Sequence, residues 1–403
     1  MTTTINNKHK KLNVPNLRFP EFEGEWEKTK FGDIATGFDY GMNAAAKNYD
    51  GVNKYIRITD IDEASSTYTD KDIVSPDGIL TDNYLVNNRD ILLARTGAST
   101  GKSYLYKQSD GKLYYAGFLI RANVMTHDPY FVFSQLHTHR YWRWVSIMSA
   151  RSGQPGINSQ EYSSFPIYTT SIEEESKIAK LLSLLDERIA TQNKIIEDLK
   201  KLKSAIIEKH YSQVKKRTTC IADLGEPFSV GSLAKDDLVE IGSPCVIYGE
   251  LFTTYGEIIS HIESYTNKTD GMILSKKGDL LFPSSTTVDA MSLIAPSVIN
   301  VDGVVLGGDM FGIHISHNYN AQYLSYYFNH IAKKQLAKFA KGSTIIHLHY
   351  TDIEKAKLLL PSLEEQNRMA KCLVALDKKV SVEQNLLSSL TCQKSYLLQQ
   401  MFI

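Results

Sequence analysis

The sequence predicts an α+β fold that arises from a tandem duplication. A mixed α/β domain followed by a long helix occurs twice, and the two helices are expected to pack as an antiparallel coiled coil. Two observations predict this fold. One is an uninterrupted amphipathic pattern of about 40 residues near the middle of the chain, and the other is a second copy shifted by 191 positions, which carries Ile172 onto Leu363.

The first long helix is predicted from Ile172 to about Ser212, a stretch without Pro or Gly. Its apolar residues recur at alternating steps of three and four, which places them in one seam along the helix. The seam consists of Ile178, Leu182, Leu185, Ile189, Ile196, Leu199 and Ile206. At ~1.5 Å per residue the helix forms a rod of roughly 60 Å, which is too long for the core of one compact domain. The seam therefore requires a partner helix.

That partner is the repeat of the same helix, predicted from Leu363 to Phe402. Its seam consists of Met369, Leu373, Leu376, Val380, Leu387, Leu390 and Leu397. Polar residues interrupt both seams at matching positions, where such residues set the register of a coiled coil. They are Gln192 and Lys203 in the first copy, and Glu383 and Lys394 in the second. Two copies that match in this way predict helices that pack on each other.

The repeat extends into the globular parts of the chain, because Asp33 and Asp90 reappear about 190 positions later as Asp223 and Asp279. We predict five segments: a polar tail at 1–16, a first domain at 17–171, a spacer helix at 172–215, a second domain at 216–361 and a second spacer helix at 362–403. Between the shared positions the domains differ, as in 96–102 against 284–287. Two explanations fit that difference equally well. Either the two domains bind different targets, or their loops changed by neutral drift after the duplication.

Composition excludes some classes of protein. With 45 basic and 45 acidic residues the formal net charge is zero, so a nucleic-acid partner must be bound by local basic surface. The chain has neither an apolar run that could span a membrane nor a signal peptide, which predicts a cytoplasmic protein. The four cysteines lack the spacing of a disulfide framework or a zinc site. They are Cys220, Cys245, Cys372 and Cys392.

One further helix is predicted from Asp128 to about Ala150, with Asp128 as its N-cap and Pro129 at its first position. It contains the run Tyr141–Trp144, which is aromatic and basic as in some nucleic-acid contacts. At helical spacing such rings more often fill a core, and we favour that interpretation.

Short motifs that resemble catalytic or cofactor sites are incomplete. Gly97–Ser103 is one residue short of a phosphate-binding P-loop, and the residues after it predict a strand instead of a helix. We expect this turn either to present polar side chains to a partner or to be a plain hairpin. Glu175–Lys177 matches half of a nuclease motif, but on a helix face that we expect to be solvated. The two His-x-His pairs, at 137–139 and 347–349, lack a third ligand, so no catalytic residue and no metal site is predicted.

Several short motifs follow one another along this two-fold repeat. They are Val14–Pro20 with Gly24–Trp26, then Gly32–Ile34, Asp90–Gly97 and the helix entry Pro361–Gln366. In this order they resemble the specificity (S) subunits of Type I restriction–modification systems over essentially the whole chain. The first helix departs from the pattern, with Thr170 in place of the proline and Glu175 in place of the glutamine.

The resemblance implies two target recognition domains, each of which recognises one half of a split double-stranded DNA sequence. It implies a bacterial cytoplasmic subunit that is not catalytic and binds no cofactor itself. Two modification subunits carry S-adenosylmethionine and methylate adenine N6, and restriction subunits use ATP and Mg to translocate and cut DNA. The rod is roughly 60 Å long, and one turn of DNA is ~34–36 Å long. The length of the helical pair would therefore set the gap between half-sites. The pair would also dock the modification subunits.

Residues that recognise bases cannot be transferred from the family, so the candidates are polar or basic residues on loops beside the shared framework. In the first domain they are Arg95, Ser99, Thr100, Lys102, Gln154 and Asn158. In the second domain they are Ser285, Thr286, Thr287, Lys341, Ser343 and His347. An Arg or Lys bound to guanine, or an Asn or Gln bound to adenine, contributes ~1–3 kcal/mol of discrimination.

Two alternatives remain open at this point. A self-contained methyltransferase or nuclease would bind S-adenosylmethionine or cut DNA as a purified chain. A coiled-coil adaptor with two ligand-binding heads would retain no specific DNA even with modification subunits present.

Overall fold

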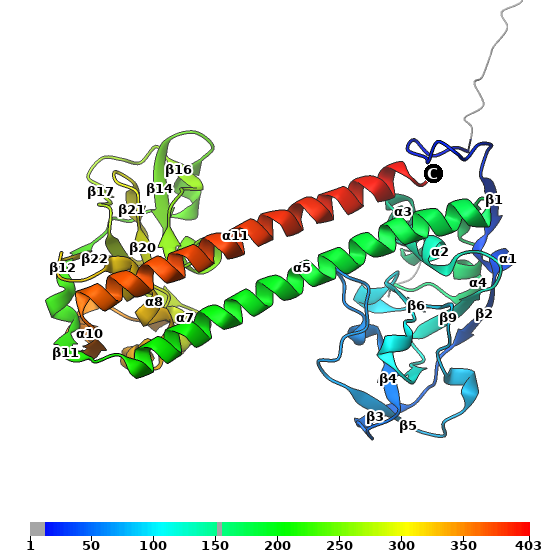
Figure 1. Cartoon of the computed structure of the whole chain (residues 1–403), viewed down its shortest axis with the longest axis horizontal. Helices are drawn as coiled ribbons and strands as arrows, with labels where there is room; N and C mark the ends of the chain where they lie inside the picture. Colours follow the sequence, from blue (N-terminus) through cyan, green and yellow to red (C-terminus); the bar gives the residue numbers. More distant parts are fainter. Residues whose placement is uncertain (1–12, 151–154) are drawn as a thin grey trace, which may run out of the picture. The chain divides into compact units, whose positions relative to one another are not determined.

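The computed structural model describes residues 13–150 and 155–403, and the chain divides into two compact units. Unit 1 comprises Met1–Asn193 and Asn385–Ile403, and unit 2 comprises Lys194–Gln384. Each unit therefore contains one globular domain and parts of both long helices. These helices are α5 (Ile172–Gln213) and α11 (Leu363–Gln400), coloured green and orange to red in Figure 1. The predicted duplication of an α/β domain followed by a long helix is confirmed.

The domain of unit 1 consists of short strands joined by turns and short helices. Its strands are β1 (Glu27–Lys30), β2 (Ala35–Tyr40), β3 (Ala45–Asn48), β4 (Lys54–Ile56), β5 (Val74–Asp77), β6 (Asp90–Ala94), β7 (Ser103–Leu105), β8 (Leu113–Tyr115), β9 (Leu119–Val124) and β10 (Pro166–Thr169). Its α-helices are α1 (Phe31–Ile34), α2 (Pro129–Gln135), α3 (His139–Ser149) and α4 (Ser159–Ser163). Its 3-10 turns are η1 (Ile58–Asp60), η2 (Asp82–Tyr84), η3 (Gly97–Ser99) and η4 (Gln108–Asp110).

The main sheet of unit 1 has the strand order β2-β9-β6-β7, and its neighbouring strands are antiparallel. Strand β6 is entirely buried, which explains its continuous apolar run after Asp90. Asp90 accepts hydrogen bonds from Asn123 Nδ2 and from the backbone N–H of Asn87, both at 2.6 Å. Burial raises the pKa of the Asp90 carboxyl. This residue therefore anchors the start of β6 against β9.

The domain of unit 2 is also built from short strands and helices. Its strands are β11 (Arg217–Cys220), β12 (Gly225–Ser229), β13 (Leu238–Val239), β14 (Ser243–Ile247), β15 (Ile258–Ile259), β16 (Ser264–Thr266), β17 (Ile273–Leu274), β18 (Asp279–Pro283), β19 (Ser285–Thr286), β20 (Ser297–Ile299), β21 (Val305–Gly307), β22 (Met310–Ile315), β23 (Ile346–His347) and β24 (Lys357–Leu360). Its α-helices are α6 (Glu250–Thr253), α7 (Ala290–Leu293), α8 (Ala321–His330), α9 (Lys333–Leu336) and α10 (Tyr350–Ile353). Its 3-10 turns are η5 (Ile221–Leu224), η6 (Lys235–Asp237) and η7 (Ala337–Phe339).

Unit 2 repeats the framework of unit 1 in its sheet β12-β22-β18-β20-β15. Strand β18 pairs with β22 as β6 pairs with β9, and Asp279 lies opposite His314 as Asp90 lies opposite Asn123. His314 Nδ1 lies 2.6 Å from Asp279 Oδ1. The domains differ in their second layer, which is the sheet β13-β16-β14-β21-β17 in unit 2 and the separate pairs β3-β5 and β4-β8 in unit 1.

Within each unit, α5 and α11 run antiparallel. In unit 1, Asp186 accepts a bond from Lys394 Nζ at 2.6 Å, and Ile178 of α5 lies in one apolar cluster with Leu397 and Met401. Residues with higher numbers on α5 therefore contact residues with lower numbers on α11. In unit 2, Lys203 pairs with Asp377 at 2.9 Å, and His210 lies 3.1 Å from Glu365.

No side chain of the two seams is fully exposed. The buried ones are Ile178, Leu182, Leu185, Ile196, Met369, Leu373, Val380 and Leu390. The partly buried ones are Ile189, Leu199, Ile206, Leu376, Leu387 and Leu397. Of the four polar interruptions, Gln192 and Glu383 are buried, and Lys203 and Lys394 are partly buried.

The first turn of α5 is solvated on one side only, and the expectation of a solvated position was wrong for Glu175. Glu174 and Glu175 are both fully buried. Arg18 donates to both carboxylate oxygens of Glu174 at 2.7 Å. Glu175 accepts from the backbone N–H groups of Asp128 at 3.0 Å and Thr170 at 3.2 Å, and it lies 2.9 Å from His127 Nδ1. Buried carboxylates are retained when they are paired in this way.

The single helix expected at 128–150 is two helices, α2 and α3. Asp128 caps α2 as predicted, with its side chain accepting from the N–H groups of Tyr130 and Phe131. The break lies at Thr138, whose hydroxyl donates to Gln135 O at 2.8 Å while its side chain caps α3. Of the aromatic run, Tyr141 is buried and Trp144 packs against the core, whereas Trp142 is 43% exposed.

No helix within the described residues is both long and apolar enough to cross a membrane. All four cysteines carry free thiols.

Candidate nucleic-acid interface

In unit 1 the turn after β6 lies against the segment before α4. We call this surface ledge 1 (residues 95–102 and 155–158). Thr96 and Gly156 form an antiparallel bridge, the N–H of Ile157 donates to Arg95 O at 2.9 Å, and the N–H of Gly97 donates to Pro155 O at 3.0 Å. The turn is therefore held by a segment about 60 positions away in the sequence. Strand β7 follows it from Ser103, as predicted.

The hydroxyl groups of two buried tyrosines hold the turn of ledge 1 in place. The Tyr162 hydroxyl donates to Ala94 O at 2.6 Å and accepts from the N–H of Gly101 at 3.1 Å. The Tyr141 hydroxyl donates to Gly101 O at 2.8 Å. Gly101 has φ +93°, and a Cβ there would lie 2.8 Å from a methyl group of Val145. Glycine is therefore required at this turn.

Arg95 is held by an aromatic ring instead of a carboxylate. Its guanidinium lies 4.6 Å from the centre of the Tyr40 ring. The Tyr40 hydroxyl accepts from the N–H of Ser159 at 3.3 Å, and this hydrogen bond lowers the pKa of Tyr40. A guanidinium that stacks on a ring keeps its N–H donors available for a partner. Arg95 is only partly buried, so these donors are accessible.

The other candidates of ledge 1 differ in accessibility. Asn158 is exposed and caps α4 by accepting from the N–H of Glu161 at 2.9 Å. Ser99 is partly buried, and Lys102 is paired with Glu63 at 3.2 Å. Thr100 is buried and donates to Gly97 O at 2.8 Å, so its hydroxyl supports the turn. Gln154 lies outside the described residues.

Unit 2 contains the same construction, which we call ledge 2 (residues 284–287 and 341–348). Ser285 pairs with His347 and Thr286 with Ile346 in the short β19-β23 ribbon. The N–H of Leu348 donates to Ser284 O at 2.9 Å, which corresponds to the bond from Ile157 to Arg95 O in ledge 1. The candidates predicted for the second domain therefore lie together.

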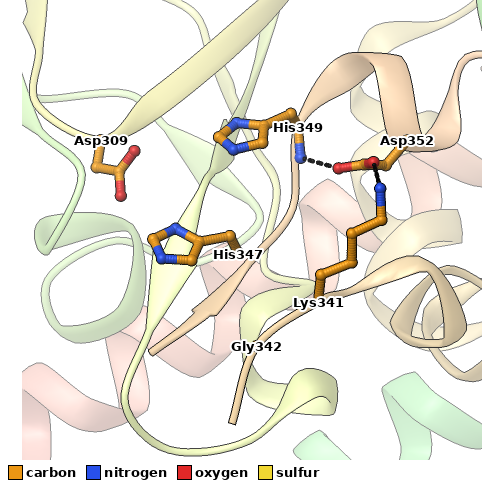
Figure 2. A pocket seen from close by; sticks show the side chains of 6 residues that line it. All are labelled: Asp309, Lys341, Gly342, His347, His349 and Asp352. Carbon is orange, nitrogen blue, oxygen red and sulfur yellow. Dashed lines mark hydrogen bonds and ion pairs between the residues drawn. The ribbon is translucent and has the colours of Figure 1, made fainter. Parts of the chain in front are cut away.

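A surface pocket of about 540 Å³ lies at ledge 2. Figure 2 shows His347 and His349 next to each other, with Asp309 on one side and the Lys341–Asp352 pair on the other. The two imidazole rings are stacked, with centres 6.1 Å apart. Lys341 donates to Asp352 and lowers the pKa of that carboxyl. The pocket thus combines hydrogen-bonding rings with a lysine that is already paired.

The candidates of ledge 2 differ in exposure, and of those named next only His347 lines this pocket. Thr287, Ser343 and His347 are exposed, Thr286 is partly buried, and Ser285 is 8% exposed. Gly342 has φ +113°, and a Cβ there would lie 2.0 Å from Ile345 O, so glycine is required at the turn into β23.

Three lysines near ledge 2 were not among the candidates chosen from sequence. Lys333, Lys334 and Lys338 lie on α9 and η7, just before Lys341. Their spacing in the run KKQLAK was visible in the sequence, but their position beside ledge 2 depends on the fold.

Both ledges present hydrogen-bonding and basic side chains on turns that are held by backbone hydrogen bonds. Such groups contact base edges and phosphates in nucleic acids. Within residues 13–150 and 155–403, no three His, Cys, Asp or Glu side chains are placed to hold a metal ion.

Comparison with known proteins gives one family. Residues 23–201 and 221–391 each match the model of the Type I restriction modification DNA specificity domain. The specificity subunit of the Type I restriction enzyme MjaVIII from Methanocaldococcus jannaschii is 24% identical over 91% of this chain and 89% of its own. The putative MjaX specificity subunit of the same organism is 24% identical over 93% and 92%. A crystal structure of a Type I restriction–modification S subunit from M. genitalium covers 97% of this chain and 99% of that one, with 16% identity and a TM-score of 0.64.

Proposed function

Because this chain belongs to the family of Type I restriction modification DNA specificity domains, we propose that it is the DNA sequence-recognition subunit of a Type I restriction–modification complex. Each globular domain recognises one half of a bipartite target in double-stranded DNA. This division of the target follows from two family domains in one chain.

The observation that carries this proposal is the repeated ledge. Ledge 1 and ledge 2 share the same backbone frame, a strand end bridged to a segment that precedes a short helix. Their side chains differ, since Arg95 and Asn158 stand in one ledge, and Thr287 and His347 in the other. One frame with two sets of hydrogen-bonding groups suits recognition of two different half-sites.

The long helices supply the second part of the function. We propose that α5 and α11 set the gap between half-sites and dock two modification subunits. Their outward faces support docking, because each helix keeps exposed apolar side chains beside its buried seam, such as Leu184 on α5 and Val382 on α11.

The chemistry of the complex belongs to its other subunits in this proposal. Modification subunits carry S-adenosylmethionine and methylate adenine N6, and restriction subunits use ATP and Mg to translocate and cleave DNA. This chain is not catalytic and contributes sequence recognition, the gap between half-sites and the docking surface. The place of action is the bacterial cytoplasm, where the host DNA lies.

Mapping methylated adenines in host DNA, with and without the gene for this chain, tests the proposal. We expect one bipartite motif to lose its methylation when the gene is deleted and to regain it when the gene is restored. A methylation map that does not change on deletion would contradict the proposal and favour an adaptor without a DNA target.

A further inference from the structure

A row of lysines lies beside ledge 2, and we call it the lysine ridge (Lys333, Lys334 and Lys338). Lys334 and Lys338 are exposed and Lys333 is partly buried. Between Asp309 and Asp352 the sequence contains no acidic residue, although the whole chain has equal numbers of acids and bases. The ridge is therefore a local concentration of positive charge on a protein without net charge.

The ridge is continuous with ledge 2. Residues of η7 contact α7, and α7 contacts both β19 and β23, the two strands of the ledge. Lys341, three residues after Lys338, bridges to His347 through two backbone hydrogen bonds of 2.9 and 2.7 Å. A partner that lies on ledge 2 and extends along α7 would thus reach the ridge.

The three ammonium groups of the ridge take no part in the ion pairs described for this unit. Among the described residues, none of them lies within ion-pair or hydrogen-bond distance of a carboxylate, whereas nearby Lys341 is bonded to Asp352. Asp289, at the start of α7, is close enough for Lys333 to lower the pKa of its carboxyl, after the larger effect of its hydrogen bonds with Ser292. The exposed charges of Lys334 and Lys338, and the partly buried charge of Lys333, remain available to an external anion.

The corresponding helix of unit 1 does not repeat this feature. There α3 follows α2 as α9 follows α8, and it exposes Trp142, Arg143 and Ile147. Arg140 of α3 is turned inward and donates to Pro166 O at 2.6 Å and to Gln135 Oε1 at 3.0 Å. The two domains therefore differ in exposed positive charge next to otherwise similar ledges.

We propose that the lysine ridge binds DNA backbone phosphates that flank the half-site of the second domain. This inference rests on the proposed function. Lysine carries a compact charge on a flexible stem, which suits a phosphate whose position varies, whereas base recognition needs fixed donors. The second domain consequently holds its half-site with a larger electrostatic contribution than the first domain.

The test is the salt dependence of DNA binding by the complete complex with its modification subunits. The DNA is a duplex that carries the bipartite motif found by methylation mapping. Binding constants are measured over a series of KCl concentrations for the wild type and for K333A/K334A/K338A. Each lost phosphate contact lowers the slope of log K against log salt by about 0.9, so we expect a loss of about 2.7 for three contacts, with the methylated motif unchanged.

Two variants control this measurement. K333R/K334R/K338R keeps the charges and should keep the wild-type slope, which separates electrostatics from a folding defect. K276A/K277A removes two exposed lysines of the same unit. Lys276 and Lys277 precede β18, whose other end leads into ledge 2, so this pair lies roughly one strand length, about 17 Å, from the ledge. It should leave the slope unchanged.

The possible results separate this inference from the proposed function. An unchanged slope in the ridge variant, or an equal loss in the control variant, overturns the inference. A changed methylated motif would mean that the ridge recognises bases, which also overturns it. A wild-type complex that shows no preference for any bipartite duplex would instead contradict the proposed function itself.

Discussion

Lys203 of α5 donates to Asp377 of α11 at 2.9 Å, and these residues come from opposite copies of the repeat. Their counterparts form the same bond in the other unit, where Lys394 donates to Asp186 at 2.6 Å. Each aspartate also accepts from a tyrosine of its own domain, Tyr326 in unit 2 and Tyr130 in unit 1. The polar interruptions of the seams thus pair across the repeat and join the helices to the domains.

The two lysines differ in their surroundings, and this difference predicts an order of stability. Lys203 also donates to Glu257 at 2.9 Å. Burial opposes ionisation of Glu257, but bonds from His330 and Lys203 lower its pKa to about 2. K203M would remove the cation shared by Asp377 and Glu257, with His330 as the remaining partner of Glu257, and should cost about 3 kcal/mol of unfolding free energy. K394M removes the cation from one carboxylate, that of Asp186, which is more exposed than Glu257, and should cost about 1 kcal/mol. Calorimetry of the two variants checks this order, and a larger loss for K394M would contradict it.

The entry turns of the long helices predict a compensating pair of substitutions. Gln366 donates to Pro361 O at 3.0 Å, while Glu175, its counterpart, accepts from the N–H of Thr170 at 3.2 Å. E175Q places an amide among donors and should destabilise unit 1 by about 1–2 kcal/mol. In T170P/E175Q the N–H is absent and the carbonyl of residue 170 can accept from the glutamine, so the double variant should be less destabilised than the sum of the single ones. If the losses of unfolding free energy were additive in a double-mutant cycle, residues 170 and 175 would not compensate each other.

His137 predicts a pH dependence of stability. Burial, with a smaller effect of Lys394, lowers its pKa to about 4. The unfolded chain therefore binds a proton that the folded chain does not between about pH 6.5 and 4. Stability is present above pH 6.5 and is lost as the pH falls toward 4, by roughly 3 kcal/mol at most. H137Q should flatten this part of the profile in denaturant titrations. An unchanged slope between pH 4 and 6.5 would exclude His137 as its origin.

Substitutions in the ledges should act on one half-site each. R95A removes the accessible guanidinium of ledge 1 and should relax the motif at one position of the first half-site, with a loss of about 5–150-fold in preference, or ~1–3 kcal/mol. H347A should do the same in the second half-site. Methylation mapping of both variants checks this assignment. If R95A altered both halves, the ledges would not act independently.

Much of the fold was accessible from the sequence because its signals are local or repeated. The seam of α5 follows from periodicity, and the offset of 191 positions matches Asp186 with Asp377 and Lys203 with Lys394. The sequence did not indicate that Glu257 joins Lys203, since it comes from a loop in another part of unit 2. Nor did it indicate that Arg18 and His127 cover the first turn of α5, which made Glu175 look solvated.

The candidate site was predicted in part for the same reason. Loops beside the framework could be chosen from the sequence, and both ledges gather residues from those loops. Which side chains remain accessible depends on long-range contacts. Thr100 turns inward toward Pro155 O, and Lys102 pairs with Glu63, over separations that no local pattern reports. The lysine ridge is the opposite example. Its lysines were visible in the sequence, but only the fold shows that they lie beside ledge 2.

The most direct test of the central claim is a change in helix length. Deleting one heptad from both α5 and α11 keeps the seam phase and shortens each helix by about 10 Å, which corresponds to about three base pairs of DNA. Methylated adenines are then mapped for the wild-type and shortened chains in the same host. The account predicts a shorter gap between two unchanged half-site sequences. Altered half-site sequences at an unchanged gap would contradict it.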